Sequence, residues 1–83
     1  MAVALVERRL AACVQVVGPV ESRYRWEGRV ETATEWLCVA KTTAERYDEL
    51  EAAIGELHSY DVPEILAVPV VRGSAAYLRW LGD

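Results

Sequence analysis

The chain has 83 residues, nine Lys and Arg against thirteen Asp and Glu, and a net charge of −4. This length allows one domain, over residues 1–83, and an acidic chain without a basic stripe argues against nucleic acid as a partner. Its apolar runs fall short of the roughly 18–20 residues that a membrane span needs, and its start lacks the pattern of a signal peptide.

Apolar and aromatic residues make up 53% of the chain, including three Trp and four Tyr. A domain of this size buries only about 60% of its unfolded surface, so these rings exceed what a small core can cover. A dense core is one interpretation. The other is a subunit interface, where Trp and Tyr are enriched, and we therefore predict a homo-oligomer.

The first predicted element is the end of an amphipathic helix over residues 2–13, where apolar residues recur at helical spacing. A β-rich stretch begins at Val14, and Gly18-Pro19 predicts a bulge or kink within it. Clean alternation follows over residues 20–27, up to a hairpin turn expected at Glu27-Gly28-Arg29. The next strand is predicted over about residues 30–42.

A second helix is predicted to begin with a capping box formed by Thr42 and Glu45. Its apolar stripe recurs at helical spacing, and the helix is expected to end near His58. Pro63 favours an extended entry into the following segment, which places His58 and Tyr60 on a loop where functional groups often collect.

The last strand is predicted over Ile65–Val71, where Pro69 cannot donate to a ladder and so indicates an edge or a bulge. Ser74 is a plausible cap for a final helix over Ala75–Leu81, closed by Gly82. The order α-β-β-α-β-α predicts an α+β fold. It would be a ferredoxin-like antiparallel sheet with helices on one face if one further strand preceded residue 1.

Candidate soft and imidazole metal ligands are Cys13, Cys38 and His58, and no two of them have the short spacing of a preformed metal site. The alternative is that both cysteines are small buried core residues, reduced as in a cytoplasmic protein. Alternatively, a His58 cation at the C-terminal end of its helix could interact favourably with the helix dipole, or the His58 ring could hydrogen-bond to the last backbone carbonyls.

A second group of polar and aromatic residues suggests a cleft or an interface. Glu35 and Lys41 share one face of a strand, and Glu64 is placed to meet Lys41 across the sheet or across a subunit boundary. The group is either an ordinary interface salt bridge or a polar cleft for a small anion or metabolite. Its members, with the candidate interface anchors, are Tyr24, Trp26, Glu35, Lys41, Tyr60, Glu64 and Trp80.

Catalysis is not expected. An enzyme needs a nucleophile with a base, or paired carboxylates in a pocket, and the single histidine would have to serve any such site. Glycine-rich phosphate loops are absent from the sequence as well.

Four blocks in a fixed order resemble the CutA family, the divalent-cation tolerance proteins. They are residues 9–14 (RLAACV), 22–28 (SRYRWEG), 58–64 (HSYDVPE) and 77–80 (YLRW). The resemblance covers about residues 5–80. It implies a ferredoxin-like trimer, similar in architecture to the PII signalling proteins, whose members have a first strand ahead of the opening helix. Either the start of this chain is shortened, which we favour, or a neighbouring chain fills the gap.

The resemblance also implies weak binding of copper (Cu²⁺) or another divalent metal ion, because Cys13 and His58 match positions linked to copper in the family. We therefore predict a cytoplasmic homotrimer whose partners are its own copies and divalent ions, without nucleic acid or membrane. Two alternatives stay open. One is a PII-like sensor that binds a small ligand at clefts between subunits, and the other is a structural trimer that organises other chains.

Overall fold

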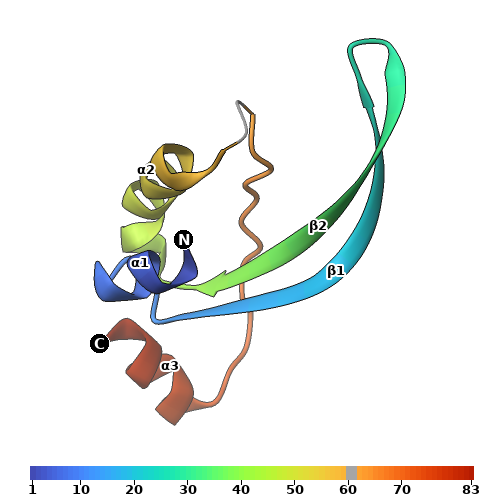
Figure 1. The fold of residues 1–83 in the computed structure, drawn as a ribbon. Helices are drawn as coiled ribbons and strands as arrows, with labels where there is room; N and C mark the ends of the chain where they lie inside the picture. Colours follow the sequence, from blue (N-terminus) through green and yellow to red (C-terminus); the bar gives the residue numbers. More distant parts are fainter. Residues whose placement is uncertain (60–61) are drawn as a thin grey trace.

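A long antiparallel hairpin forms the frame of the molecule, which is a computed structural model that describes residues 1–59 and 62–83 (Figure 1). Strand β1 (Cys13–Trp26) pairs with β2 (Arg29–Lys41), from Cys13 opposite Lys41 to Trp26 opposite Arg29. The turn between them is Glu27-Gly28, with φ of 50° and 79°. Two successive positive φ values match the twist of the flanking strands, so the predicted turn is confirmed.

The predicted irregularity at Gly18-Pro19 is also present. The pairing shifts between Val17 and Val20, where β1 carries two residues opposite the single residue Trp36 of β2. A Cβ atom on Gly18 would lie 2.7 Å from Cε3 of Trp36, so glycine lets the indole ring lie against the bulge.

The buried core lies at the base of the hairpin, where helices α1 (Ala2–Glu7) and α2 (Tyr47–Leu57) gather (Figure 1). A short 3₁₀ turn, η1 (Ala44–Arg46), leads into α2. Leu5 is only 2% exposed and contacts a cluster that also includes Ala11, Leu50 and Ala53. The strand residues Val14 and Ala40 border this cluster, so the helices cover one end of the sheet.

Helix α1 is shorter than the predicted helical stretch over residues 2–13. The backbone N–H groups of Arg9 and Leu10 donate to the carbonyls of Val6 and Leu5, both at 3.0 Å. Arg9 adopts a φ of 60°. These bonds and this conformation form the left-handed ending of many helices, and they turn the chain directly into β1.

The predicted capping box at Thr42 and Glu45 is wrong. The residue before η1 is Thr43, which makes no capping bond with its side chain. The hydroxyl of Thr42 instead donates to the carbonyl of Leu10 at 2.7 Å. This bond joins the end of β2 to the segment after α1. Such a long-range contact cannot be recognised from the local spacing of Thr42 and Glu45.

Helix α3 (Ala75–Gly82) follows the predicted final helix closely. The Ser74 hydroxyl accepts a hydrogen bond from the backbone N–H of Tyr77 at 3.3 Å, so the predicted cap is confirmed. No helix among the described residues is both long and apolar enough to cross a membrane.

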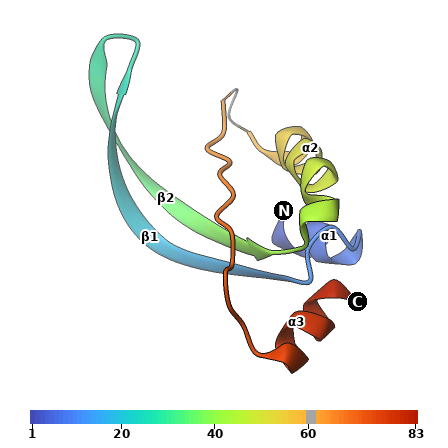
Figure 2. The same cartoon turned by 180° about the vertical axis from the view of Figure 1, so that it is seen from behind.

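The predicted strand over Ile65–Val71 is not formed. Residues 63–70 follow an extended path (Figures 1 and 2) but join no ladder, and the sheet of the described residues contains only β1 and β2. A strand exists through its hydrogen-bonded neighbour, and neither β1 nor β2 pairs with this run in the described residues. Leu66 and Val68 are therefore 81% and 84% exposed.

Candidate functional site

A cavity of about 710 Å³ lies between the outer part of the hairpin and the segment after α2. Strand β1 supplies half of the lining residues, β2 supplies one carboxylate, and the segment after α2 supplies the rest. The lining residues are Ser22, Arg23, Tyr24, Trp26, Glu35, Ser59, Val62 and Glu64.

The pleat of the hairpin explains why these side chains meet. Ser22, Tyr24 and Trp26 lie two residues apart, so they share one face of β1. Glu35 is directly opposite Val20 in the register, and opposed residues of an antiparallel pair point to the same face. Glu35 therefore joins the aromatic side chains of β1 rather than the opposite face.

The charges in the cavity are mainly acidic. Glu35 is half-buried, Glu64 is exposed, and neither carboxylate forms a salt bridge within residues 1–59 and 62–83. Among the described lining residues the one cation is Arg23, which pairs with Glu21, two positions earlier on β1. The cavity therefore combines two carboxylates, hydroxyl groups and aromatic surface, which suits a small polar ligand or a cation.

The structure brings together Tyr24, Trp26, Glu35 and Glu64 of the predicted cleft. Tyr60 lies outside the described residues. Ser22, Arg23, Ser59 and Val62 were missed. Residues two apart in a strand share one face, so the spacing of Tyr24 and Trp26 could have identified Ser22 as a third lining residue.

Lys41 is placed elsewhere, at the base of the hairpin. Its Nζ lies 5.9 Å from the centre of the Tyr77 ring, and the Tyr77 and Trp80 rings are 5.5 Å apart. The expected contact between Lys41 and Glu64 across the sheet is therefore wrong for the single chain. Helix α3 returns to the base of the hairpin, where its Tyr77 ring forms a cation–π contact with Lys41.

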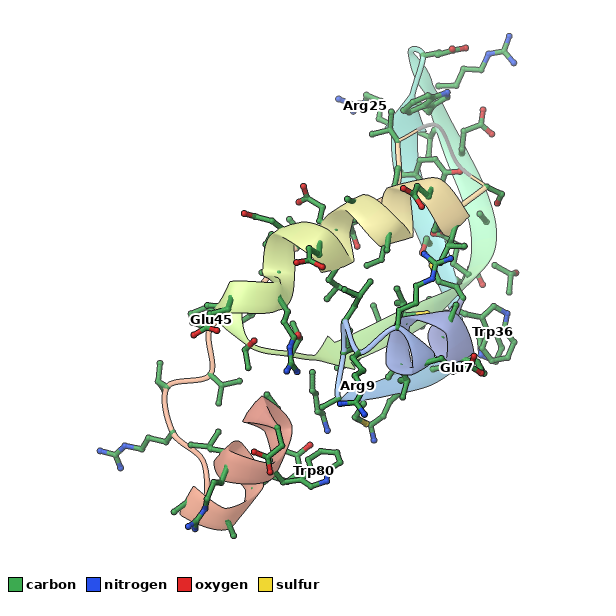
Figure 3. All side chains as sticks on the ribbon, turned by 90° about the vertical axis from the view of Figure 1, so that its left-hand side faces the viewer. Glu7, Arg9, Arg25, Trp36, Glu45 and Trp80 are labelled. Carbon is green, nitrogen blue, oxygen red and sulfur yellow. The ribbon has the colours of Figure 1, made fainter. Side chains whose placement is uncertain are left out.

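Most of the described aromatic residues lie at the surface of the chain, and none of them is buried in its core. Tyr24, Trp26 and Trp80 are each exposed, and so is Trp36 at 61%. Figure 3 shows that Trp36 and Trp80 project from different elements, β2 and α3. The dense-core interpretation is wrong for this chain.

Cys13 and His58, the predicted metal ligands, belong to different elements. Cys13 is half-buried at the start of β1, and His58 is half-buried at the end of α2, where its backbone N–H donates to the Ile54 carbonyl at 2.8 Å. Cys38 is exposed, which corrects its prediction as a core residue. In the described parts of the chain, no group of three His, Cys, Asp or Glu side chains could hold a metal ion.

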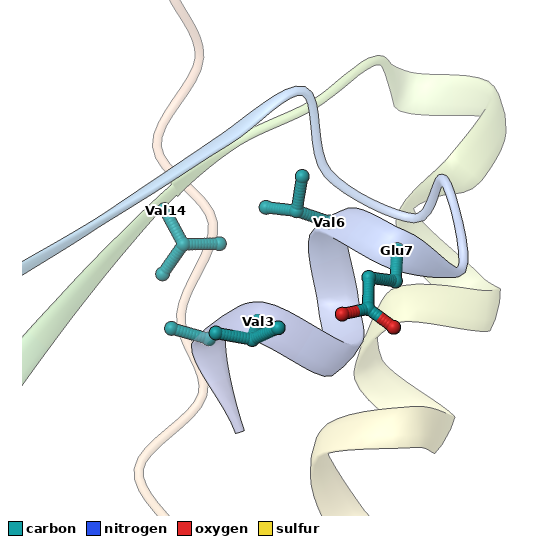
Figure 4. Close-up of a pocket in the computed structure, with 5 residues that line it drawn as sticks. Val3, Val6, Glu7 and Val14 are labelled. Atoms are coloured by element: carbon teal, nitrogen blue, oxygen red, sulfur yellow. The ribbon is translucent and has the colours of Figure 1, made fainter.

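A smaller cavity of about 290 Å³ lies between α1 and β1 (Figure 4). Val3, Val6 and Val14 line it together with Ala2 and Glu7. The lining is almost wholly apolar, and nothing in it resembles a metal or catalytic site.

The chain matches the family described as CutA1 divalent ion tolerance protein over residues 1–83. It belongs to this family. The divalent-cation tolerance protein CutA of Thermus thermophilus is 47% identical over 83 residues, which are 100% of this chain and 81% of that protein. The structure of the Thermus protein matches with a TM-score of 0.95 and 47% identity, over 98% of this chain and 79% of its own.

The eukaryotic relatives of this CutA1-family chain are longer. A CutA homologue of Xenopus laevis is 40% identical over 95% of this chain, which spans 52% of that protein. The chloroplastic CutA of Arabidopsis thaliana is 42% identical over 98% of this chain, which spans 44% of it. The chain thus spans about half the length of these relatives.

The prediction of a cytoplasmic protein is overturned. A structure of CutA from Archaeoglobus fulgidus, titled periplasmic, matches with a TM-score of 0.93 and 40% identity, over 96% of this chain and 78% of its own. The Arabidopsis relative is chloroplastic. Members of one family thus occupy different compartments, so two unpaired cysteines do not indicate which one holds this CutA1-family chain.

Proposed function

We propose that this chain acts in divalent-cation tolerance by binding copper or another divalent ion weakly, as a homotrimer of ferredoxin-like subunits. The observation that carries this proposal is the family match over all 83 residues, together with relatives that are named for divalent-cation tolerance. The role is one of binding, and we propose no catalysis.

The metal ligands in this proposal are His58 and Cys13. Imidazole and thiolate are ligands that copper prefers. Because the described residues of one chain offer no group of three ligands, a complete site needs side chains from several copies. Exposed aromatic residues on β1 and α3 give the copies a surface on which to associate. Binding should therefore be weak in one chain and stronger in the oligomer.

Equilibrium dialysis of Cu²⁺ against the oligomer tests the proposal. His58→Ala should weaken binding by about tenfold or more, since a ligand loss of about 1.4 kcal/mol has that effect. Ser59→Ala, at the next and exposed position, is the matched control and should leave binding unchanged. Unchanged copper binding in both His58→Ala and Cys13→Ser would contradict the assignment of these ligands.

A second candidate function is a sensor of a small ligand, similar to the PII proteins. The cavity of about 710 Å³ favours it, because Tyr24, Trp26, Glu35 and Glu64 line one space. A thermal-shift screen separates the two functions. A metabolite that raises the melting temperature of the wild type but not of Glu35→Gln supports the sensor, whereas a shift with Cu²⁺ alone supports the metal binder.

A further inference from the structure

Charge is distributed unevenly along the chain. The segments 8–20, 36–44 and 65–82 contain no Asp or Glu, whereas the other residues contain all thirteen, with only four Lys or Arg. The acid-free segments carry the remaining five cations, which are Arg8, Arg9, Lys41, Arg72 and Arg79. A chain with a net charge of −4 therefore has a positive part, and such a part attracts anions.

The fold brings these three segments together at the base of the hairpin. Residues 13–17 of β1 pair with residues 37–41 of β2, and the Ala12 backbone N–H donates to the Lys41 carbonyl at 2.9 Å. Figures 1 and 3, which are views at right angles, both show the C-terminal end of α3 turned toward α1. In Figure 3 the side chains of Arg9 and Trp80 lie between the two helices.

Lys41 carries its charge next to aromatic rings. Its Nζ lies 5.9 Å from the centre of the Tyr77 ring, and the Trp80 ring is 5.5 Å beyond. A ring attracts an ammonium group but does not neutralise it as a carboxylate does. Within residues 1–59 and 62–83, neither Lys41 nor Arg9 forms a salt bridge. Both cations can therefore take a bound anion as their partner.

The two rings are open to solvent as well. Tyr77 is 41% exposed and Trp80 is 52% exposed, so a planar group can stack on them. The part of the chain outside the acid-free segments has a net charge of −9 and repels a long polyanion such as nucleic acid. The ligand that fits is therefore small, with an aromatic ring beside its negative charge.

We propose that Arg9, Lys41, Tyr77 and Trp80 form a binding site for a small planar aromatic molecule that carries a phosphate group. The two cations bind the phosphate, and the two rings stack on the planar part. This lysine–aromatic site goes beyond the proposed metal function. It contains neither of the proposed metal ligands, so metal-free protein tests it separately.

The test is isothermal titration calorimetry of the full chain with naphthyl phosphate, in the presence of EDTA. Binding should be saturable and should weaken as salt is added, because salt screens exposed charges. Naphthol lacks the charge and inorganic phosphate lacks the ring, so each should bind about tenfold or more weakly. Absence of naphthyl phosphate binding, or equally tight binding of either control compound, would overturn the proposal.

Four protein variants place the binding. Lys41→Gln and Trp80→Leu should each weaken it about tenfold or more, whereas Lys41→Arg keeps the charge and should keep most of the affinity. Arg29→Gln is the matched control, because it removes a cation at the start of β2, near the hairpin turn and outside the site. Equal effects of Lys41→Gln and Arg29→Gln would show only a general attraction of anions, and would contradict a defined site.

The same titration at increasing protein concentration tests whether the site stays accessible when copies associate. The affinity for naphthyl phosphate should not change with protein concentration. A loss of binding as oligomers form would mean that a second copy covers the Tyr77 and Trp80 rings, and the proposed site would then be an interface instead.

Discussion

At the scale of single residues, the hydrogen-bonded pair Tyr47 and Glu51 makes the stability of α2 depend on pH. The phenol of Tyr47 donates to Oε1 of Glu51 at 2.7 Å, one helical turn away. This hydrogen bond is the main cause that raises the pKa of Tyr47 above its ordinary value of 10.0, and desolvation and the negative charge of Glu51 add to it.

The raised pKa predicts a change in the alkaline titration. The folded state holds the phenol proton longer than the unfolded state does. The contribution of this bond to stability is therefore complete below about pH 10 and is lost as pH rises through the raised pKa. Glu51→Gln should lower the pKa of Tyr47, read from tyrosinate absorbance as the difference from Tyr47→Phe. An unchanged pKa in Glu51→Gln would show that the pair does not form in solution.

At the scale of elements, the end of α1 carries local strain. Arg9 has a φ of 60°, in the left-handed region that glycine occupies at far lower cost. The hydrogen bonds of Arg9 and Leu10 back to α1 hold it there. The strained conformation of Arg9 is retained because this turn leads the chain from α1 directly into β1.

Arg9→Gly should therefore raise the free energy of unfolding by about 0.5–1 kcal/mol, because the left-handed cost of about 1–2 kcal/mol exceeds the entropy cost of glycine of about 0.4–1 kcal/mol. Arg8→Gly is the matched control, because Arg8 has an ordinary φ of −78° and gains nothing from glycine. Urea denaturation of the two variants and the wild type measures the difference. Equal effects of the two substitutions, or a loss of stability in Arg9→Gly, would show that no strain is stored at this position.

The elements with local signals could be predicted from the sequence. The turn at Glu27-Gly28, the bulge at Gly18-Pro19 and the cap at Ser74 each depend on residues within a few positions of one another. The strand over Ile65–Val71 could not, because a strand depends on a neighbour far away in the sequence, and the residues alone do not show whether that neighbour is present.

The residues of the candidate site could likewise be predicted where local spacing places them, and not where long-range packing does. Tyr24, Trp26 and Glu35 meet because the register of one hairpin decides their faces, and the register follows from the turn. Lys41 was misplaced because its partner Tyr77 belongs to α3, whose return to the hairpin depends on long-range packing. Thr42 was misread for a similar reason, since its hydroxyl bonds to a carbonyl 32 positions earlier.

At the scale of the whole molecule, the chain has more apolar surface than it can cover alone. Its buried apolar core consists of Leu5, Ala11, Leu50 and Ala53 among the described residues, while rings of β1, β2 and α3 are exposed. The molecule is also long and thin, with extents of 46 × 25 × 19 Å. Such a surface favours association over an isolated monomer.

The proposed function is that this chain binds divalent ions as a trimer. Native mass spectrometry of the 83-residue chain, first without metal and then titrated with Cu²⁺, tests both parts at once. We expect a species of three chains that takes up copper in a fixed ratio and loses that uptake in His58→Ala. A trimer that takes up no copper, or a monomer at all concentrations, would contradict it.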